Sequence, residues 1–207
     1  MQGQSNHETK RIGLTCQGLS VWRNGTRVVR DLSFKIGCGQ TLMIAGPNGS
    51  GKTSILRALA GFLACDGDIG FNAAPLAATH MHYVGHQSGL KQHLSVIENL
   101  QFMAAILADA RPNGVAEAMD IWGVVRLAHS AVGELSAGQL RRTAMARLTV
   151  VARPIWLLDE PFTALDQAGR DILSAQVAAH CAAGGVVVAS SHEPLPFADQ
   201  HLDLGVV

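Results

Sequence analysis

The segment Gly46-Pro47-Asn48-Gly49-Ser50-Gly51-Lys52-Thr53 has residue types and a spacing suited to binding phosphate. Its pattern is glycine, four residues, and then Gly-Lys-Thr. The glycines let main-chain N–H groups turn toward phosphate oxygens without a side chain in the way. The ammonium group of Lys52 supplies a charge for the outer phosphates, and the hydroxyl of Thr53 can bind Mg²⁺. We therefore predict that this segment, called the phosphate loop below, binds a nucleotide with its metal.

Two carboxylates follow a second apolar segment. Residues 155–158 read Ile-Trp-Leu-Leu, and Asp159 and Glu160 come directly after them. A carboxylate at the carboxyl end of a strand beside a phosphate loop can hold the Mg²⁺ that bridges the phosphates, so Asp159 is a metal candidate. The next carboxylate, Glu160, can polarise an attacking water. An acidic turn in solvent is the alternative for this pair alone, and the phosphate loop upstream favours the metal role.

A second candidate anion site lies between these two motifs. Residues 135–139 read Leu-Ser-Ala-Gly-Gln, and Ser136 has the residue type that begins a helix. The small residues after it leave the helix N-terminus open to an anion. On its own, this segment could equally be an ordinary capped helix.

The elements that must position these groups alternate between strand and helix. An apolar strand candidate, residues 41–45, leads into the phosphate loop, and a helix is expected from Lys52 to Gly61. Further strands are expected at 69–71, 155–158 and 186–189, and a hairpin with its turn at 24–25. Further helices are expected at 95–109, 115–122, 136–151 and 167–183. Residues 66–68 read as a turn. Continuous apolar strands alternating with helices predict a parallel sheet covered on both faces.

Composition narrows the function classes. The 207 residues are 48% hydrophobic, and 16 basic residues balance 16 acidic ones, which argues against a dedicated nucleic-acid binder. The four cysteines lack metal-type spacing and read as buried apolar residues of a reducing compartment. The first residues are polar and unlike a signal peptide, and no apolar run is long enough to cross a bilayer. We expect a cytoplasmic chain with a disordered lead-in at residues 1–10.

The order of these motifs resembles the ATP-binding cassette (ABC) family. The family signature is Leu-Ser-Gly-Gly-Gln, and this chain departs from it by one small residue, Ala137. The resemblance implies an α/β fold: a P-loop NTPase, with an ABC-type ATPase core, a small antiparallel β subdomain and an inserted α-helical lobe. It places a single ATP-binding domain at residues 11–207, with the helical lobe at about 87–136.

The same resemblance implies roles for further residues, with ATP as the nucleotide and Mg²⁺ as the metal. Gln87 matches the Q-loop glutamine, which touches Mg²⁺ or the attacking water and senses the membrane partner. His192 matches the switch histidine that contacts the terminal phosphate, and Asp166 matches the D-loop aspartate. Ser136, Gly138 and Gln139 match nucleotide-contacting signature positions. Trp22 lies where the family has its adenine-stacking aromatic, although core packing is almost as good an interpretation of it.

Local strings such as 85–91 (GHQSGLK) and 137–148 (AGQLRRTAMARL) make the chain similar to the ATP-binding subunits of the cytochrome c maturation system, the haem-export type. That similarity implies a homodimer closed by ATP, a CcmB-like integral membrane subunit as partner, and a peripheral location on the cytoplasmic face of the bacterial inner membrane. It implies no nucleic-acid partner. The alternatives are the ATPase of another small bacterial exporter, an ABC ATPase acting on nucleic acid or ribosomes, and a P-loop kinase. The kinase reading leaves residues 135–139 and His192 unexplained.

Overall fold

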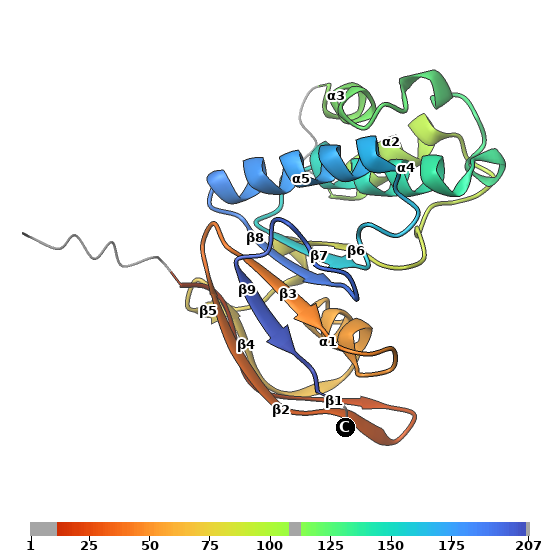
Figure 1. Cartoon of the computed structure of the whole chain (residues 1–207). Coiled ribbons are helices and arrows are strands. Elements are labelled where there is room, and N and C mark those ends of the chain that lie inside the picture. Colours follow the sequence, from red (N-terminus) through yellow and green to blue (C-terminus); the bar gives the residue numbers. More distant parts are fainter. Residues whose placement is uncertain (1–11, 108–112, 206–207) are drawn as a thin grey trace, which may run out of the picture.

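A five-stranded parallel sheet forms the centre of the fold in the computed structural model, which describes residues 12–107 and 113–205 (Figure 1). All four neighbouring strand pairs run parallel. In order across the sheet, the strands are β6 (Met81–Val84), β7 (Ile155–Asp159), β8 (Val186–Ser190), β3 (Thr41–Ala45) and β9 (Gln200–Asp203). The phosphate loop leaves the carboxyl end of β3, and Asp159 ends β7, so the sheet brings the two motifs to one edge.

Side chains of the central strands alternate between two hydrophobic cores. In β7, Ile155 and Leu157 belong to one core, whereas Trp156 and Leu158 belong to the other. Because successive side chains of a strand point to opposite faces, a strand that is apolar throughout must be covered on both sides. This explains why β7 and β8 read as unbroken hydrophobic runs in the sequence.

One of these cores is closed by a second, antiparallel sheet in the order β2-β1-β4-β5. Its strands are β1 (Ile12–Arg23), β2 (Thr26–Gly37), β4 (Cys65–Phe71) and β5 (Ala74–Pro75). The turn of the predicted hairpin, Asn24 and Gly25, has positive φ at both residues (48° and 76°), as the type that matches strand twist requires. The hairpin is therefore confirmed, with Arg23 paired to Thr26.

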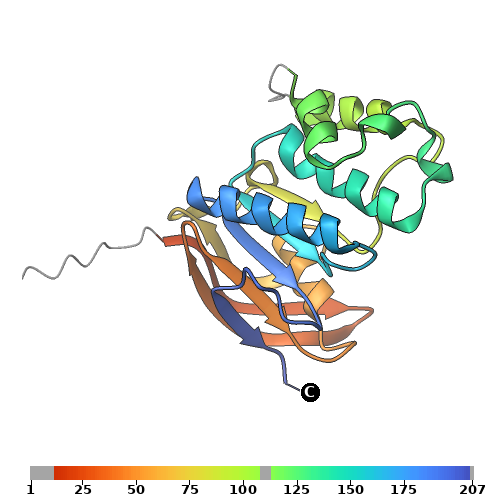
Figure 2. The same cartoon turned by 45° about the horizontal axis from the view of Figure 1, so that its top comes forward.

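Helices fill the remaining space on either side of the parallel sheet. Helix α1 (Lys52–Leu59) packs between the two sheets, and its apolar residues belong to the core that they share. The other core contains residues of α2 (Val96–Leu107), α3 (Gly114–Ile121), α4 (Ala137–Val150) and α5 (Gln167–Ala182). Figures 1 and 2 show these four helices on the opposite side of the parallel sheet from β1 and β2. The predicted fold class, an α/β ATPase core with an antiparallel β part and a helical part, is confirmed.

Some boundaries differ from the sequence-based expectation. The predicted turn at 66–68 is wrong, because these residues form part of β4, in which Asp66 and Asp68 pair with β1. Gly67 has φ of 101° beside an irregularity in that pairing, which is how a strand absorbs a turn-like sequence. Strands β5, β6 and β9 are not among the strands that the sequence predicts. The predicted end of the second helix, at 108 and 109, and the lead-in at 1–10 lie outside the described residues.

Among the residues that the structure describes, no helix combines the length and the apolar character that crossing a bilayer requires.

Candidate nucleotide-binding site

The phosphate loop depends on glycine at two positions where a side chain would not fit. Gly46 has φ of 146°, and a Cβ there would lie 2.7 Å from the carbonyl oxygen of Leu204. Gly51 has φ of 101° and is the N-cap of α1. No side chain of the described residues caps this helix, so its first N–H groups stay available to an anion. The loop therefore has the local structure that phosphate binding requires.

The two polar side chains at the start of α1 are held by neighbouring groups. Lys52 is 7% exposed, and its Nζ donates to the carbonyls of Gly46 (2.7 Å) and Pro47 (3.0 Å). The Thr53 hydroxyl lies 3.0 Å from both carboxylate oxygens of Asp159. Asp159 is buried and also accepts a hydrogen bond of 2.6 Å from Ser190 Oγ. The predicted metal pair, Thr53 and Asp159, is thus in direct contact.

Glu160 begins a tight turn directly after β7. Its φ is 47°, a left-handed conformation that is strained for a residue with a Cβ. Its N–H donates to both the carbonyl and the hydroxyl of Ser190, each at 3.1 Å. Its side chain is 20% exposed, and Oε2 lies 2.8 Å from Nδ1 of the more exposed His192. A candidate base and the candidate switch histidine therefore form one pair.

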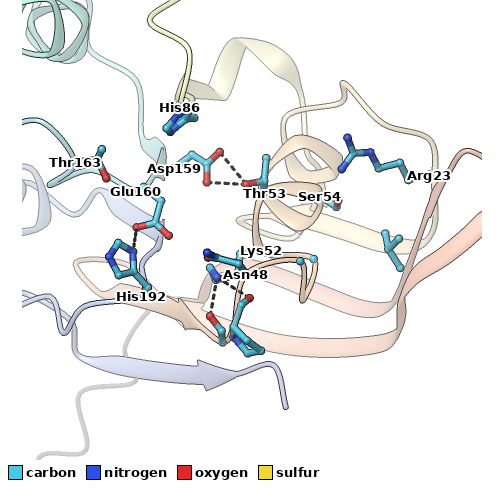
Figure 3. A pocket seen from close by; sticks show the side chains of 15 residues that line it. Arg23, Asn48, Lys52, Thr53, Ser54, His86, Asp159, Glu160, Thr163 and His192 are labelled. Carbon is cyan, nitrogen blue, oxygen red and sulfur yellow. Dashed lines mark hydrogen bonds and ion pairs between the residues drawn. The ribbon is translucent and has the colours of Figure 1, made fainter. Parts of the chain in front are cut away.

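A cavity of about 630 Å³ joins these groups. Figure 3 shows Lys52, Thr53 and Asp159 at its centre, Glu160 and His192 at one end, and Arg23 at the other. The residues that line it are Arg23, Val28, Gly46, Pro47, Asn48, Gly49, Gly51, Lys52, Thr53, Ser54, His86, Asp159, Glu160, Thr163 and His192. The volume is in the range of cavities that hold small ligands.

Three of the predicted site residues in or near this region do not line the cavity. Ser50 is the one phosphate-loop residue missing from the lining, and its Oγ is buried without a partner among the described residues. Gln87 is exposed, and the preceding His86 lines the cavity instead. Trp22 donates from Nε1 to Asp66 (3.2 Å), and its neighbour Arg23 lines the cavity. The structure thus leaves the proposed adenine contact of Trp22 without support.

The signature residues, 135–139, span the N-terminus of α4 and lie away from this cavity. Ser136 Oγ accepts from the N–H of Gln139 (3.3 Å), and the Gln139 side chain accepts from the N–H of Ser136 (2.9 Å). This reciprocal pair caps the helix. Gly138 lies against the D-loop (residues 164–166), because a Cβ there would be 3.2 Å from the carbonyl of Ala164. None of the three predicted nucleotide contacts of this segment lines the cavity within the same chain.

The D-loop aspartate is tied to the signature helix. Asp166 caps α5 by accepting from the N–H of Gly169 (3.1 Å), and it forms an ion pair with Arg142 of α4 at 2.5 Å. The hydrogen bond from Arg142 lowers the pKa of the Asp166 carboxyl below its ordinary value. Like the signature residues, Asp166 does not line the cavity in its own chain.

Sequence reasoning missed five residues that line the cavity: Arg23, Val28, Ser54, His86 and Thr163. None belongs to a motif with a spacing that the sequence displays. Arg23 and Val28 lie beside the turn of the β1–β2 hairpin, and only the packing of that hairpin against α1 brings them near the loop. His86 directly precedes the predicted Gln87, which is the sequence signal that points nearest to it.

The residues at the centre of the cavity fit a magnesium ion bound together with phosphates. Among the described residues, no three His, Cys, Asp or Glu side chains gather into a cluster that could hold a metal alone. Mg²⁺ is commonly held by one or two protein oxygens together with phosphate oxygens and water. The hydroxyl of Thr53 and the carboxylate of Asp159, already 3.0 Å apart, form such a donor set.

Comparison with known proteins agrees with this geometry. The ABC transporter family model matches residues 29–163. The "Cytochrome c biogenesis ATP-binding export protein CcmA" of Rhizobium meliloti (strain 1021) is 42% identical over 193 residues, which are 89% of this chain and 93% of the relative. The protein of the same name from Pseudomonas putida (strain KT2440) is 40% identical over 204 residues, covering 94% of this chain and 97% of the relative.

A solved structure gives the same result for the fold. An ABC transporter ATP-binding protein from Pyrococcus furiosus superposes with a TM-score of 0.81 at 26% identity, covering 92% of this chain and 96% of that chain. The chain therefore belongs to the ATP-binding proteins of the ABC transporter family, and among them it is most like the cytochrome c biogenesis ATP-binding export proteins.

Proposed function

We propose that this chain is the ATP-hydrolysing subunit of a membrane transporter complex that serves c-type cytochrome biogenesis, of the haem-export type. The observation that carries the ATPase role is that one cavity joins the phosphate loop to Glu160 and His192. The observation that carries the biological role is the identity of about two residues in five, over nearly the whole chain, with the cytochrome c biogenesis export proteins.

Each group around the cavity has a chemical task. The open N-terminus of α1 and the Lys52 ammonium bind the phosphates, for which Lys52 must leave the two loop carbonyls. Glu160 accepts a proton from the attacking water. His192 orients Glu160 through the 2.8 Å contact of Nδ1 with Oε2. Gln87 is proposed to contact the attacking water or the metal.

We propose Mg²⁺ as the metal of this site, held by Thr53 and Asp159 when ATP is bound. When bound, the ion would neutralise charge that develops on the phosphates during hydrolysis. The buried Ser190 hydroxyl keeps one Asp159 oxygen occupied, so the carboxylate is held in a fixed orientation for this task.

The cavity of one chain is only half of the proposed site. Ser136 and Gly138 offer a second anion-binding helix end, yet neither lines the cavity of their own chain. The α4 N-terminus of a second copy would supply the missing groups, and Asp166 would lie at the same contact. We therefore propose a two-fold homodimer that ATP closes.

The membrane partner is proposed to dock beside the segment that contains Gln87. A groove of about 310 Å³ lies next to this segment, and Gly89 and Leu90 line it. Three large apolar side chains of the groove are exposed, which is unusual for a surface without a partner: Phe62 (65%), Phe102 (46%) and Ile106 (64%). A short apolar helix from an integral membrane subunit, CcmB-like, is the proposed occupant, and it would hold this chain at the cytoplasmic face of the inner membrane.

The decisive experiment combines the purified membrane complex with a strain that lacks this chain. The chain is expected to co-purify with a multi-span membrane protein, and Lys52→Ala is expected to abolish ATPase activity and c-type cytochrome formation. Lys35→Ala, an exposed lysine of β2, is the control. Undiminished ATPase activity in Lys52→Ala would overturn the ATPase role. Normal c-type cytochrome levels in the strain without the chain would overturn the biological role.

A further inference from the structure

Arg141 of α4 connects two segments of the proposed site that are far apart in the sequence. Its side chain is buried, at 6% exposure. Nη1 donates to the carbonyl of Gly85 (2.7 Å), and Nη2 donates to the carbonyls of Asp159 and Glu160 (2.8 Å each). One guanidinium therefore holds the main chain just after β6 and the main chain at the end of β7.

Both segments lead directly to groups that face the nucleotide cavity. Gly85 precedes His86, which lines the cavity, and Gln87. The carbonyls of Asp159 and Glu160 flank the strained position of Glu160, where φ is 47°. A strained conformation persists only when the surroundings fix it from several sides. Here Ser190 binds the N–H of Glu160, and Arg141 binds its carbonyl.

The chemistry of arginine suits this task better than that of lysine. A planar guanidinium donates from two terminal nitrogens in fixed directions, so it can bind carbonyls of two segments at once. A lysine ammonium is a single point and cannot span the same arrangement. Burial lowers the pKa of Arg141 from its ordinary value, while the charges of Asp159 and Glu160 act in the opposite direction.

A second arginine of the same helix provides a natural comparison. Arg147 donates to the carbonyls of Tyr83 (2.9 Å) and Ser88 (2.8 Å), so it holds the Gln87 segment on both sides. Neither of these hydrogen bonds reaches Asp159 or Glu160. The two arginines thus share the helix and the Gln87 segment, but only Arg141 also holds the turn at Glu160.

We propose that Arg141 is a positioning residue that fixes the Glu160 turn relative to the Gln87 segment and α4. A displacement of α4 would then move the base and the Gln87 segment together. This inference rests on the proposed function, because it assigns Glu160 a role in ATP hydrolysis. Helix α4 would then have two roles. Its N-terminus would contact the nucleotide of the proposed second copy, and Arg141 would connect it to Glu160 of its own chain.

The test uses Arg141→Met, Arg141→Lys and Arg147→Met in the purified membrane complex, with the unmodified chain and Glu160→Gln alongside. Steady-state kinetics give kcat and the KM for ATP. Hydrogen exchange, read by mass spectrometry, reports on the main chain at 83–90 and at 158–163. Arg141→Met is expected to lower kcat by roughly tenfold to a hundredfold through misplacement of the base, with KM changed less than about threefold.

The exchange pattern separates positioning from general damage. Arg141→Met is expected to speed exchange in both segments, whereas Arg147→Met speeds it at 83–90 alone. Arg141→Lys, which keeps the charge, is expected to restore only part of kcat, and it carries the test if the methionine variant does not fold. The inference would be overturned if Arg141→Met and Arg147→Met sped hydrogen exchange equally in both segments. An unchanged kcat in Arg141→Met would also overturn it. An unmodified complex without ATPase activity would instead overturn the proposed function.

Discussion

At the scale of single residues, the orientation of two neighbours in β1 decides which side chain can contact the adenine ring. Trp22 and Arg23 are adjacent in a strand, so they point to opposite faces. Trp22 is 43% exposed and hydrogen-bonded to Asp66, whereas Arg23 lines the cavity at the end opposite Glu160 (Figure 3). A guanidinium can stack on a base as an aromatic ring does.

We therefore predict that Arg23→Ala weakens ATP binding more than Trp22→Ala does. The loss of one stacking contact is expected to raise the Kd for ATP roughly fivefold to thirtyfold, or about 1–2 kcal/mol. Trp22→Ala is expected to change the Kd less than about twofold. Titration of the purified chain with a fluorescent ATP analogue measures both. A larger effect of Trp22→Ala would restore Trp22 as the adenine contact.

The sequence predicts the site residues that belong to motifs, but not those that only the packing of distant elements brings to the site. Residues 46–53, Asp159 and Glu160 are predicted from local motifs whose chain geometry nearly determines their positions, whereas His192 is predicted from the family resemblance alone. With the exception of Ser50, the structure brings them to one cavity. Arg23, His86 and Arg141 carry no such local pattern. Their positions follow from packing between elements that are far apart in the sequence, which spacing alone does not encode.

At the scale of elements, His82 makes the contact between β6 and α4 sensitive to acid. His82 is 6% exposed, and its Nε2–H donates to the carbonyl of Val151 at 2.7 Å. Burial, together with the charges of Arg147, Arg153 and His180, lowers the pKa of His82 to about 4, although the hydrogen bond to Val151 opposes the shift. The buried imidazole is therefore neutral near pH 7.

The sign of the effect follows from this lowered pKa. Between pH 6.5 and about 4 the unfolded chain binds the proton and the folded chain does not, so acid favours unfolding. The contribution of neutral His82 to the free energy of unfolding is fully present above pH 6.5. It decreases by about 2–3 kcal/mol as the pH falls toward 4.

His82→Gln, which keeps a donor for Val151 but does not titrate, is expected to reduce the dependence of the free energy of unfolding on pH between 6.5 and 4. Urea unfolding at pH 7 and at pH 4.5 measures the free energy of unfolding of each variant. His129→Gln, at an exposed histidine, is the control. If His82→Gln and the unmodified chain lose the same stability at pH 4.5, the prediction is wrong.

The elements themselves were predictable where their local pattern agrees with their burial. The apolar strands β3, β7 and β8 and the capped helices α2 and α4 have such patterns, and they lie where the sequence indicates. Strand β9 is an edge strand of four residues whose side chains are exposed or half-buried, so it lacks a hydrophobic signal. Residues 66–68 have a turn-like composition, and pairing with β1 overrides it. In both β9 and residues 66–68, pairing with a strand that is distant in the sequence determines the structure.

At the scale of the whole molecule, the groove lined by Phe62, Phe102 and Ile106 is the surface through which we expect the chain to bind its membrane partner. Ile106 is 64% exposed in this groove. Ile106→Glu is expected to abolish co-purification with the membrane subunit, because a charge placed against an apolar partner loses its hydration. Ile121→Glu, on an exposed part of α3 that lines a different cavity, is the matched control. Retention of the partner by Ile106→Glu would place the docking surface elsewhere.

The dimer that ATP is proposed to close should persist in a variant that binds ATP but does not hydrolyse it. Glu160→Gln keeps the shape of the side chain and removes its basicity, so ATP is expected to bind without being hydrolysed. The purified variant is then expected to double its mass when ATP and Mg²⁺ are added, as measured by light scattering. A mass that stays that of one chain would contradict the shared site.

A second substitution in the Glu160→Gln chain tests which surface closes the dimer. Ala137 is exposed in the first turn of α4, where an acidic residue favours the helix but repels phosphate. Adding Ala137→Glu is therefore expected to prevent the ATP-dependent doubling without lowering the melting temperature, whereas Ala137→Gln, which has the same length and no charge, is expected to permit it. Because Ala137 does not line the nucleotide cavity of its own chain, binding of ATP to the separate chain is expected to be unchanged. Doubling that survives Ala137→Glu would mean that the two copies meet through another surface, and the α4 N-terminus would then not be the missing half of the site.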